Sequence, residues 1–237
     1  MRKAGLVVVA LCLVGSWTVA GAADGKNVFR FGAAYVSPTG DISGEESVNE
    51  DLGDGTMLSL EGSLTLEPQS EIALLLGYER RVTDLFGVEL MVWNAKHDVD
   101  GSFDGEYWLL DSDTGELIEN GTIQFTETLG DVKVMPLTAG LNFHLTPKSS
   151  FDLYLGPTIG YVFYGDLDVE DERLSIDDDF TWGATLGLDL PMGDKGWMFS
   201  GALRYLDTEA SPDDLGPGDQ SMDVSPWVLQ VSAGYRF

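Results

Sequence analysis

The chain closes on the stretch Pro226-Trp-Val-Leu-Gln-Val-Ser-Ala-Gly-Tyr-Arg-Phe237. From Trp227 onward, large apolar side chains alternate with smaller or more polar ones, and an aromatic residue stands at each end. Successive side chains of a β-strand point to opposite faces, so the stretch predicts a strand with one oily face. In water, the unpaired edge of such an apolar strand would promote aggregation. A closed barrel in a lipid bilayer avoids this, because its last strand pairs with its first.

Seven earlier segments alternate in the same way. They are Val28–Val36, Glu71–Arg81, Val88–Ala95, Val132–Leu145, Phe151–Tyr164, Phe180–Leu190 and Trp197–Leu206. With the last segment they predict an all-β fold, an eight-stranded antiparallel transmembrane β-barrel. Three connections are short, as expected for periplasmic turns, and four are long and acidic, as expected for extracellular loops. The long ones are Ser37–Ser70, His97–Asp131, Gly165–Asp179 and Asp207–Asp223.

Two alternatives accompany this prediction. Met57–Glu67, inside the first long loop, also alternates, and it is an extension of the second strand, a hairpin above the membrane, or part of a ten-stranded barrel. A soluble β-sandwich would alternate as well. The aromatic side chains favour the membrane barrel, because they lie mostly at strand ends on the apolar face, where interfacial girdles form.

The N-terminus predicts a secretory signal. Arg2 and Lys3 precede an apolar run, and small residues follow it, so residues 1–22 are expected to be a signal peptide and residues 23–237 the barrel. An uncleaved anchor is the alternative. The single cysteine, Cys12, lies inside this segment, which leaves the barrel without thiol chemistry. The net charge of −27 argues against nucleic acid as a partner.

The chain resembles the outer membrane protein W (OmpW) family. The segments that carry the resemblance are Val36-Ser-Pro38, Thr83-Asp84 with Gly87-Val-Glu-Leu90, Leu155-Gly156 with Gly160-Tyr161, Trp182-Gly-Ala184, Pro226-Trp-Val228 and Ser232-Ala-Gly-Tyr-Arg-Phe237. The resemblance implies an outer-membrane barrel that takes up or exports small, mainly hydrophobic molecules through an apolar channel. Likeness to other such barrels also implies that Tyr235 and Phe237 form the signal read by the outer-membrane assembly machinery.

Inward parity places charged residues of both signs in the lower lumen. They are Arg30, Glu79, Glu89, Asp152, Asp189, Arg204 and Arg236. Charges inside a narrow barrel should pair, because an unpaired buried charge is costly. We therefore expect a charged plug that closes a water path on the periplasmic side.

Higher in the lumen the inward residues are mainly apolar. The predicted hydrophobic pocket consists of Leu75, Met91, Trp93, Pro136, Val162, Tyr164, Leu206 and Val228. Such a lining fits a site for a hydrophobic molecule. The alternative is that these side chains simply fill a small barrel.

The sequence is also compatible with functions other than transport. The long acidic loops would also suit an adhesion, receptor or membrane-stabilising barrel without transport. No enzyme is predicted, because the two histidines, His97 and His144, have no evident serine partner. No cofactor or metal site is predicted, and Asp111-Ser-Asp-Thr-Gly115 only faintly resembles a calcium loop. The expected partners are outer-membrane lipid and lipopolysaccharide, the assembly machinery and small hydrophobic solutes, with divalent cations possible at the acidic loops.

Overall fold

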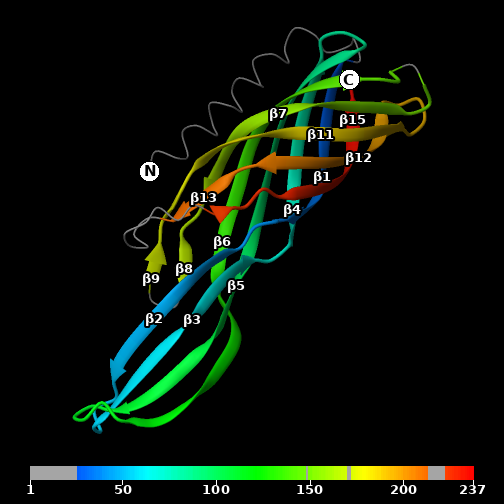
Figure 1. Ribbon diagram of the computed structural model, residues 1–237. Coiled ribbons are helices and arrows are strands. Elements are labelled where there is room, and N and C mark those ends of the chain that lie inside the picture. Colours follow the sequence, from blue (N-terminus) through cyan, green and yellow to red (C-terminus); the bar gives the residue numbers. More distant parts are fainter. Residues whose placement is uncertain (1–25, 148, 170–171, 213–221) are drawn as a thin grey trace.

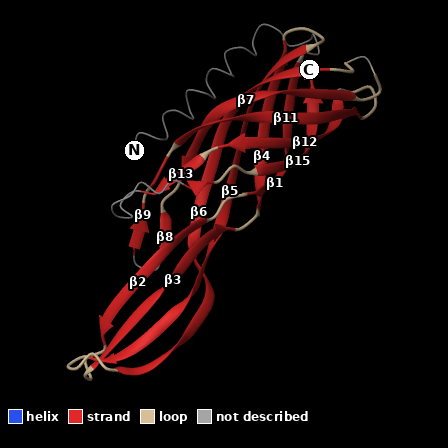
Figure 2. Ribbon diagram, in the orientation of Figure 1, coloured by secondary structure: helices blue, strands red, loops and turns tan. Residues whose placement is uncertain are grey.

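The computed structural model describes residues 26–147, 149–169, 172–212 and 222–237, and the predicted signal peptide lies outside these ranges. Within them the chain is built of strands and connecting turns (Figure 2). No helix in the described part of the chain is long and apolar enough to cross a membrane.

Eight strands form one closed antiparallel ring, as predicted. In order around the wall they are β1 (Asn27–Ser37), β4 (Glu71–Arg81), β5 (Phe86–Asp111), β6 (Leu117–His144), β7 (Asp152–Tyr164), β11 (Asp179–Pro191), β12 (Trp197–Asp207) and β15 (Trp227–Arg236). Pairing of β5 with β6 and of β1 with β15 closes the ring.

The first and last strands, β1 and β15, meet at a seam. Their register runs from Val28 opposite Arg236 to Ser37 opposite Trp227. Beyond it, the backbone N–H of Phe237 donates to the carbonyl of Asn27 at 2.9 Å, and the N–H of Asn27 donates back at 3.1 Å. The final strand thus has no free edge toward β1, which confirms the prediction made from its sequence.

The outer surface of the wall is apolar. Ile72 and Leu74 on β4 are 68% and 71% exposed, although both are large aliphatic residues. A strand of about ten residues is the length that crosses a bilayer, and aromatic pairs border the wall at both ends. Phe86–Phe143 and Trp197–Tyr235 lie at the end with the short turns, and Tyr161–Phe163 and Tyr205–Trp227 lie at the other. This is the girdle pattern of a membrane barrel.

Two of the expected loops are instead largely strand. β2 (Ile42–Asp51) and β3 (Thr56–Pro68) form a hairpin, and β3 pairs with the outer half of β5 from Val99 to Asp111. β6 pairs with β5 over the same stretch. The result is a four-stranded sheet, here called the arm, that projects from the barrel away from the C-terminus (Figure 1). At about 3.3 Å per residue, it reaches roughly 40–50 Å beyond the wall.

The remaining connections fold over the outer end of the lumen. β8 (Leu167–Val169) pairs with β6 and with β9 (Glu172–Leu174), and β10 (Ile176–Asp177), β13 (Glu209–Pro212) and β14 (Met222–Asp223) form a small sheet. Ile176, Ala210 and Val224 from this region pack in one buried cluster with Val162 and Tyr164 of β7. The upper lumen is therefore covered by its own loops.

Candidate functional site

The lower lumen holds a buried network of charges centred on Arg30. Its Nη2 atom lies 2.8 Å from Glu79 Oε2 and 2.8 Å from Asp189 Oδ2, and its Nη1 lies 3.5 Å from Glu89 Oε1. All four side chains are at most 1% exposed. They come from β1, β4, β5 and β11, so the network ties distant parts of the wall together across the lumen. Ser200 also donates a hydrogen bond to Asp189 at 2.6 Å.

Two members of this network were missed by the sequence prediction. Arg81 pairs with Asp152 and also lies 3.7 Å from Glu79 and 3.8 Å from Asp189. His144 sits between two carboxylates, with Nε2 2.6 Å from Glu79 and Nδ1 3.1 Å from Asp152. Both residues share inward parity with their predicted neighbours, and that signal could have identified them. Only an imidazolium has a proton on each nitrogen, so the two contacts favour a charged His144.

Two members of the predicted plug, Arg204 and Arg236, lie at its margins. Arg204 stands at the top of the network, where its Nη2 lies 2.7 Å from Glu89 Oε2 and its Nη1 donates to Thr138 at 3.1 Å. Arg236 lies at the periplasmic rim and is only partly buried. The geometry therefore brings six of the seven predicted residues into one ion-pair network and leaves Arg236 at its edge.

The predicted pocket residues are all buried, but they divide into two groups. Leu75, Met91, Trp93, Leu206 and Val228 share one apolar cluster with Ala34, Val36, Ala73 and Ala95. Val162 and Tyr164 belong to the upper cluster under the loops, and Pro136 is buried on β6. Leu206 and Val228 are 0% exposed, so the side chains pack against one another. A ligand in this lumen would have to displace some of them.

The ladder between β5 and β6 has a gap of two residue pairs beside the first apolar cluster. The pairing of β5 with β6 jumps from Val92–Leu137 to Ala95–Val134. Trp93 and Asn94 thus have no partners in the β5–β6 ladder, where they lie opposite Pro136 and Met135. Proline has no N–H to donate to a neighbouring strand. At this gap two of the predicted pocket residues, Trp93 and Pro136, lie side by side on the lumen face of neighbouring strands.

Comparison with known proteins identifies the family of this barrel. A family model described as the OmpW family matches residues 23–237. The chain belongs to the OmpW family. Because the named relatives are outer-membrane proteins, this OmpW-family barrel resides in the bacterial outer membrane.

Three relatives illustrate how much of the chain is shared. Outer membrane protein W of Escherichia coli (strain K12) is 26% identical over 223 residues, which cover 87% of this chain and 92% of that protein. An uncharacterized outer-membrane protein, y4mB, of Sinorhizobium fredii is 30% identical over 147 residues, covering 56% of this chain and 64% of that protein. The crystal structure of OprG from Pseudomonas aeruginosa has a TM-score of 0.59 at 24% identity, with 89% of this chain and 95% of that chain covered. The last similarity is one of fold.

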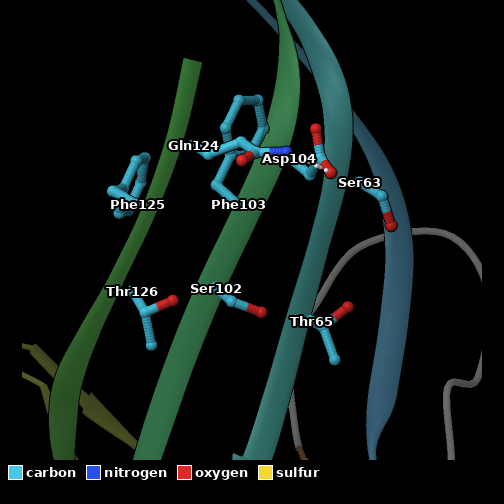
Figure 3. Close-up of a pocket in the computed structure, with 8 residues that line it drawn as sticks. All are labelled: Ser63, Thr65, Ser102, Phe103, Asp104, Gln124, Phe125 and Thr126. Atoms are coloured by element: carbon cyan, nitrogen blue, oxygen red, sulfur yellow. Dashed lines mark hydrogen bonds between the residues drawn. The ribbon is translucent and has the colours of Figure 1, made fainter.

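The arm of this OmpW-family barrel has two unlike faces. One continues the inward parity of β5 and carries apolar residues such as Leu64, Phe103 and Phe125, which are neighbours in register. The other face is polar. The arm also bears a hollow of about 570 Å³, shown in Figure 3, which is lined by polar residues and by Phe103 and Phe125. Hydroxyl, carboxylate and amide groups of β3, β5 and β6 surround this hollow, and Gln124 donates a hydrogen bond to Asp104 at 2.8 Å. The arm strands, 42–68 and 99–130, contain many acidic residues and no lysine or arginine.

The faint calcium motif at the arm tip is a hydrogen-bonded turn. Asp111 Oδ1 accepts bonds from the backbone and hydroxyl of Thr114 and from the backbone N–H of Asp113. These bonds lower the pKa of Asp111 by favouring its ionised form. In the described part of the chain no group of three or more His, Cys, Asp or Glu side chains is placed to hold a metal ion.

The second histidine anchors the base of the arm. His97 is buried, and its Nδ1 lies 2.7 Å from the carbonyl oxygen of Gln69. The N–H of Gln69 in turn donates to the carbonyl of Asp98 at 2.8 Å. These contacts lie where β5 changes its partner from β4 to β3, so they fix the branch point between barrel and arm.

Proposed function

We propose that this barrel lets small, mainly hydrophobic molecules pass the outer membrane through its apolar upper lumen, while the charged network closes the periplasmic end to water. The observation that carries the proposal is the vertical division of the lumen. Above Arg204 the lumen contains two buried apolar clusters, with buried polar exceptions such as Thr181, Thr208 and His97, and below it the buried charges are paired. Transfer of an apolar molecule from water into the upper zone lowers its free energy. Ions and water, in contrast, meet a closed network of charges. We propose no catalytic role.

We infer that the molecule leaves the lumen sideways. The loops cover the outer end and the charged network fills the inner end, but the wall lacks paired ladder positions at Trp93 and Pro136. A side opening at this height would release an apolar molecule directly into the hydrocarbon region. The packed cluster would open by side-chain rotation, and Met91 is suited to this because its side chain is flexible.

Ion conductance and apolar uptake together test this proposal. Intact cells that make the barrel should take up N-phenylnaphthylamine, an uncharged fluorescent probe, faster than cells without it. The purified barrel in a planar bilayer should show little steady ion current. A large, steady and unselective conductance would contradict the charged closure, and unchanged probe uptake would contradict the passage of apolar molecules.

The substitution Pro136→Ala tests the side opening. Alanine supplies the N–H that proline lacks, so the strand ladder can close beside Trp93. We expect slower N-phenylnaphthylamine uptake by intact cells and a barrel that is more stable to urea by about 0.5–1.5 kcal/mol, the net value of one hydrogen bond.

Pro157→Ala is the matched control. Pro157 lies in β7 where the β6–β7 ladder also lacks two pairs, between Gly140–Thr158 and Phe143–Leu155. It lies next to Thr158, which is level with Gly140 and hence with Glu89 in the charged zone. This variant should leave probe uptake unchanged. Equal slowing by both substitutions would show that wall stiffness, rather than the position of the gap, controls uptake.

The arm supports a second candidate, a surface-binding barrel without transport. Passage of small molecules does not require a sheet that extends far beyond the membrane. The acidic composition of the arm would attract cationic surfaces. Replacing residues 43–65 and 102–126 by short turns should then abolish attachment of cells to a cationic surface. The transport proposal instead expects probe uptake to survive this change.

The lipid and assembly partners complete the proposal. We propose that the apolar outer wall contacts outer-membrane lipid and lipopolysaccharide, and that Tyr235 and Phe237 are read by the assembly machinery. The support is the exposed apolar belt and the place of both aromatics at the closing seam.

A further inference from the structure

Trp93 carries a polar group that the barrel itself leaves unused. Its side chain is 1% exposed, and its indole Nε1 has no hydrogen-bond partner among the residues that the structure describes. Burying an N–H without an acceptor costs about 1–3 kcal/mol, so almost all buried donors in proteins are paired. Other buried polar atoms without a partner, such as Arg204 Nε, lie in or beside the charged network, whereas Trp93 Nε1 lies in the apolar zone. An unpaired donor in that zone indicates that an acceptor is supplied from outside the chain.

The apolar cluster around Trp93 offers almost no acceptor of its own. Its other members are alkyl side chains, apart from the sulfur of Met91. That sulfur already lies 3.2 Å from the amide nitrogen of Gln230. A molecule that fills this zone would thus meet hydrocarbon on most sides and the unpaired N–H of Trp93, while the Gln230 amide is already engaged with Met91.

The charges below Trp93 decide which acceptor fits. The Arg204 guanidinium lies 6.0 Å from the centroid of the indole ring, which repels a ligand ammonium group from this position. Arg204 is itself paired with Glu89, at 2.7 Å. A carboxylate from a ligand would therefore add a buried charge without its own counter-ion, which is costly. A neutral oxygen avoids both penalties.

We propose that Trp93 is the hydrogen-bond donor of a binding site for small apolar molecules that carry one neutral oxygen acceptor, such as a ketone, aldehyde, ester or ether. The apolar body lies among Leu75, Met91 and Val228, and the oxygen accepts from Trp93 Nε1. This inference rests on the proposed function, since it names the class of molecule that the apolar lumen takes.

A matched pair of ligands tests the inference. The full barrel, refolded in lipid nanodiscs with ¹⁵N-labelled tryptophan, is titrated with 4-phenyl-2-butanone and with n-butylbenzene, a hydrocarbon of similar shape. The indole N–H resonance of Trp93 should move downfield with the ketone, and the hydrocarbon should not produce this shift. Trp93→Phe should weaken ketone binding about 2- to 12-fold, as expected for one hydrogen bond, and leave hydrocarbon binding unchanged. Trp108→Phe, in the arm, is the control and should change neither.

The outcomes separate the two proposals. If both ligands bind the lumen and Trp93→Phe affects them equally, the assigned donor is wrong while the apolar lumen stands. If the ketone binds without a downfield shift of the Trp93 resonance, the donor assignment is likewise overturned, whether or not the variant folds. If neither ligand perturbs any lumen resonance, the proposed function itself fails.

Discussion

Replacing Arg30 with methionine is expected to destabilise the barrel by about 3–5 kcal/mol and to open it to ions. Removal of one partner from a buried ion pair typically costs this much, because it leaves a charge without compensation. Here three carboxylates, those of Glu79, Asp189 and Glu89, lose their common cation. Their mutual repulsion should admit water into the lower lumen. Urea unfolding in lipid vesicles measures the stability, and planar-bilayer recording measures the current.

Arg80→Met is the control for this prediction. Arg80 is the neighbour of Arg81 on the outward parity of β4, and it donates a hydrogen bond to Asn27 at 2.8 Å rather than joining the buried network. Its loss should change stability little and current not at all. A double variant, Arg30→Met with Asp189→Asn, removes one charge of each sign and should recover part of the lost stability. An Arg30 variant as tight to ions as the original barrel would contradict the proposed plug.

Deleting Phe237 is expected to remove most of the barrel from the outer membrane. Its backbone makes two hydrogen bonds with Asn27 at the seam, and its ring stacks on Tyr235 with centroids 6.1 Å apart. Tyr235 in turn contacts Trp197 at 5.1 Å. The deletion thus weakens the closing seam and removes the proposed assembly signal together. Quantification of the folded, protease-resistant form in outer-membrane fractions provides the measurement.

Two further variants separate the two roles of Phe237. Phe237→Ala keeps the backbone bonds and removes only the ring, so a comparable loss would assign the effect to the aromatic signal. Phe151→Ala removes an exposed aromatic near the same rim, on the turn before β7, and should leave the protein level unchanged. Normal levels of the deletion variant would contradict the assembly role of the terminal aromatic.

The wall was predictable because the bilayer enforces a strict alternation. Lipid on one side demands large apolar residues such as Leu74 and Leu76, and the lumen accepts small, polar or charged residues such as Gly77 and Glu79. Period two then assigns each residue to a face without further information. For this reason the sequence correctly placed Glu89, Asp189 and the apolar residues inside the barrel.

The arm was not predictable as strand by the same argument. Both of its faces meet water, so no solvent boundary imposes a strict pattern on stretches such as Glu119–Thr126 of β6. Its acidic residues suggested loops, whereas the pairing of β3 with β5 and of β5 with β6 stabilises extended chain. Only the alternation of Met57–Glu67 indicated a hairpin, and the structure confirms that alternative.

The partners inside the lumen could not be read from the sequence either. Parity gives the face of a residue, but contacts across a barrel depend on how neighbouring strands are staggered. Arg81 and Arg236 both have inward parity near the periplasmic rim, yet Arg81 joins the ion pairs and Arg236 remains at the margin. His144 shares this inward parity, but its two carboxylate contacts depend on the registers of β4 and β7.

The two strands whose ladder is interrupted, β5 and β6, also form two of the four strands of the arm. β5 and β6 run without interruption from the periplasmic rim to the arm tip, with a bulge at Val99/Asp100 between the two regions. A pair of bonded strands carries tension along its length. If the proposed side opening forms, we expect a force on the arm tip outside the cell to reach the interrupted β5–β6 ladder at Trp93 and Pro136, so that mechanical load at the cell surface would change the width of the opening.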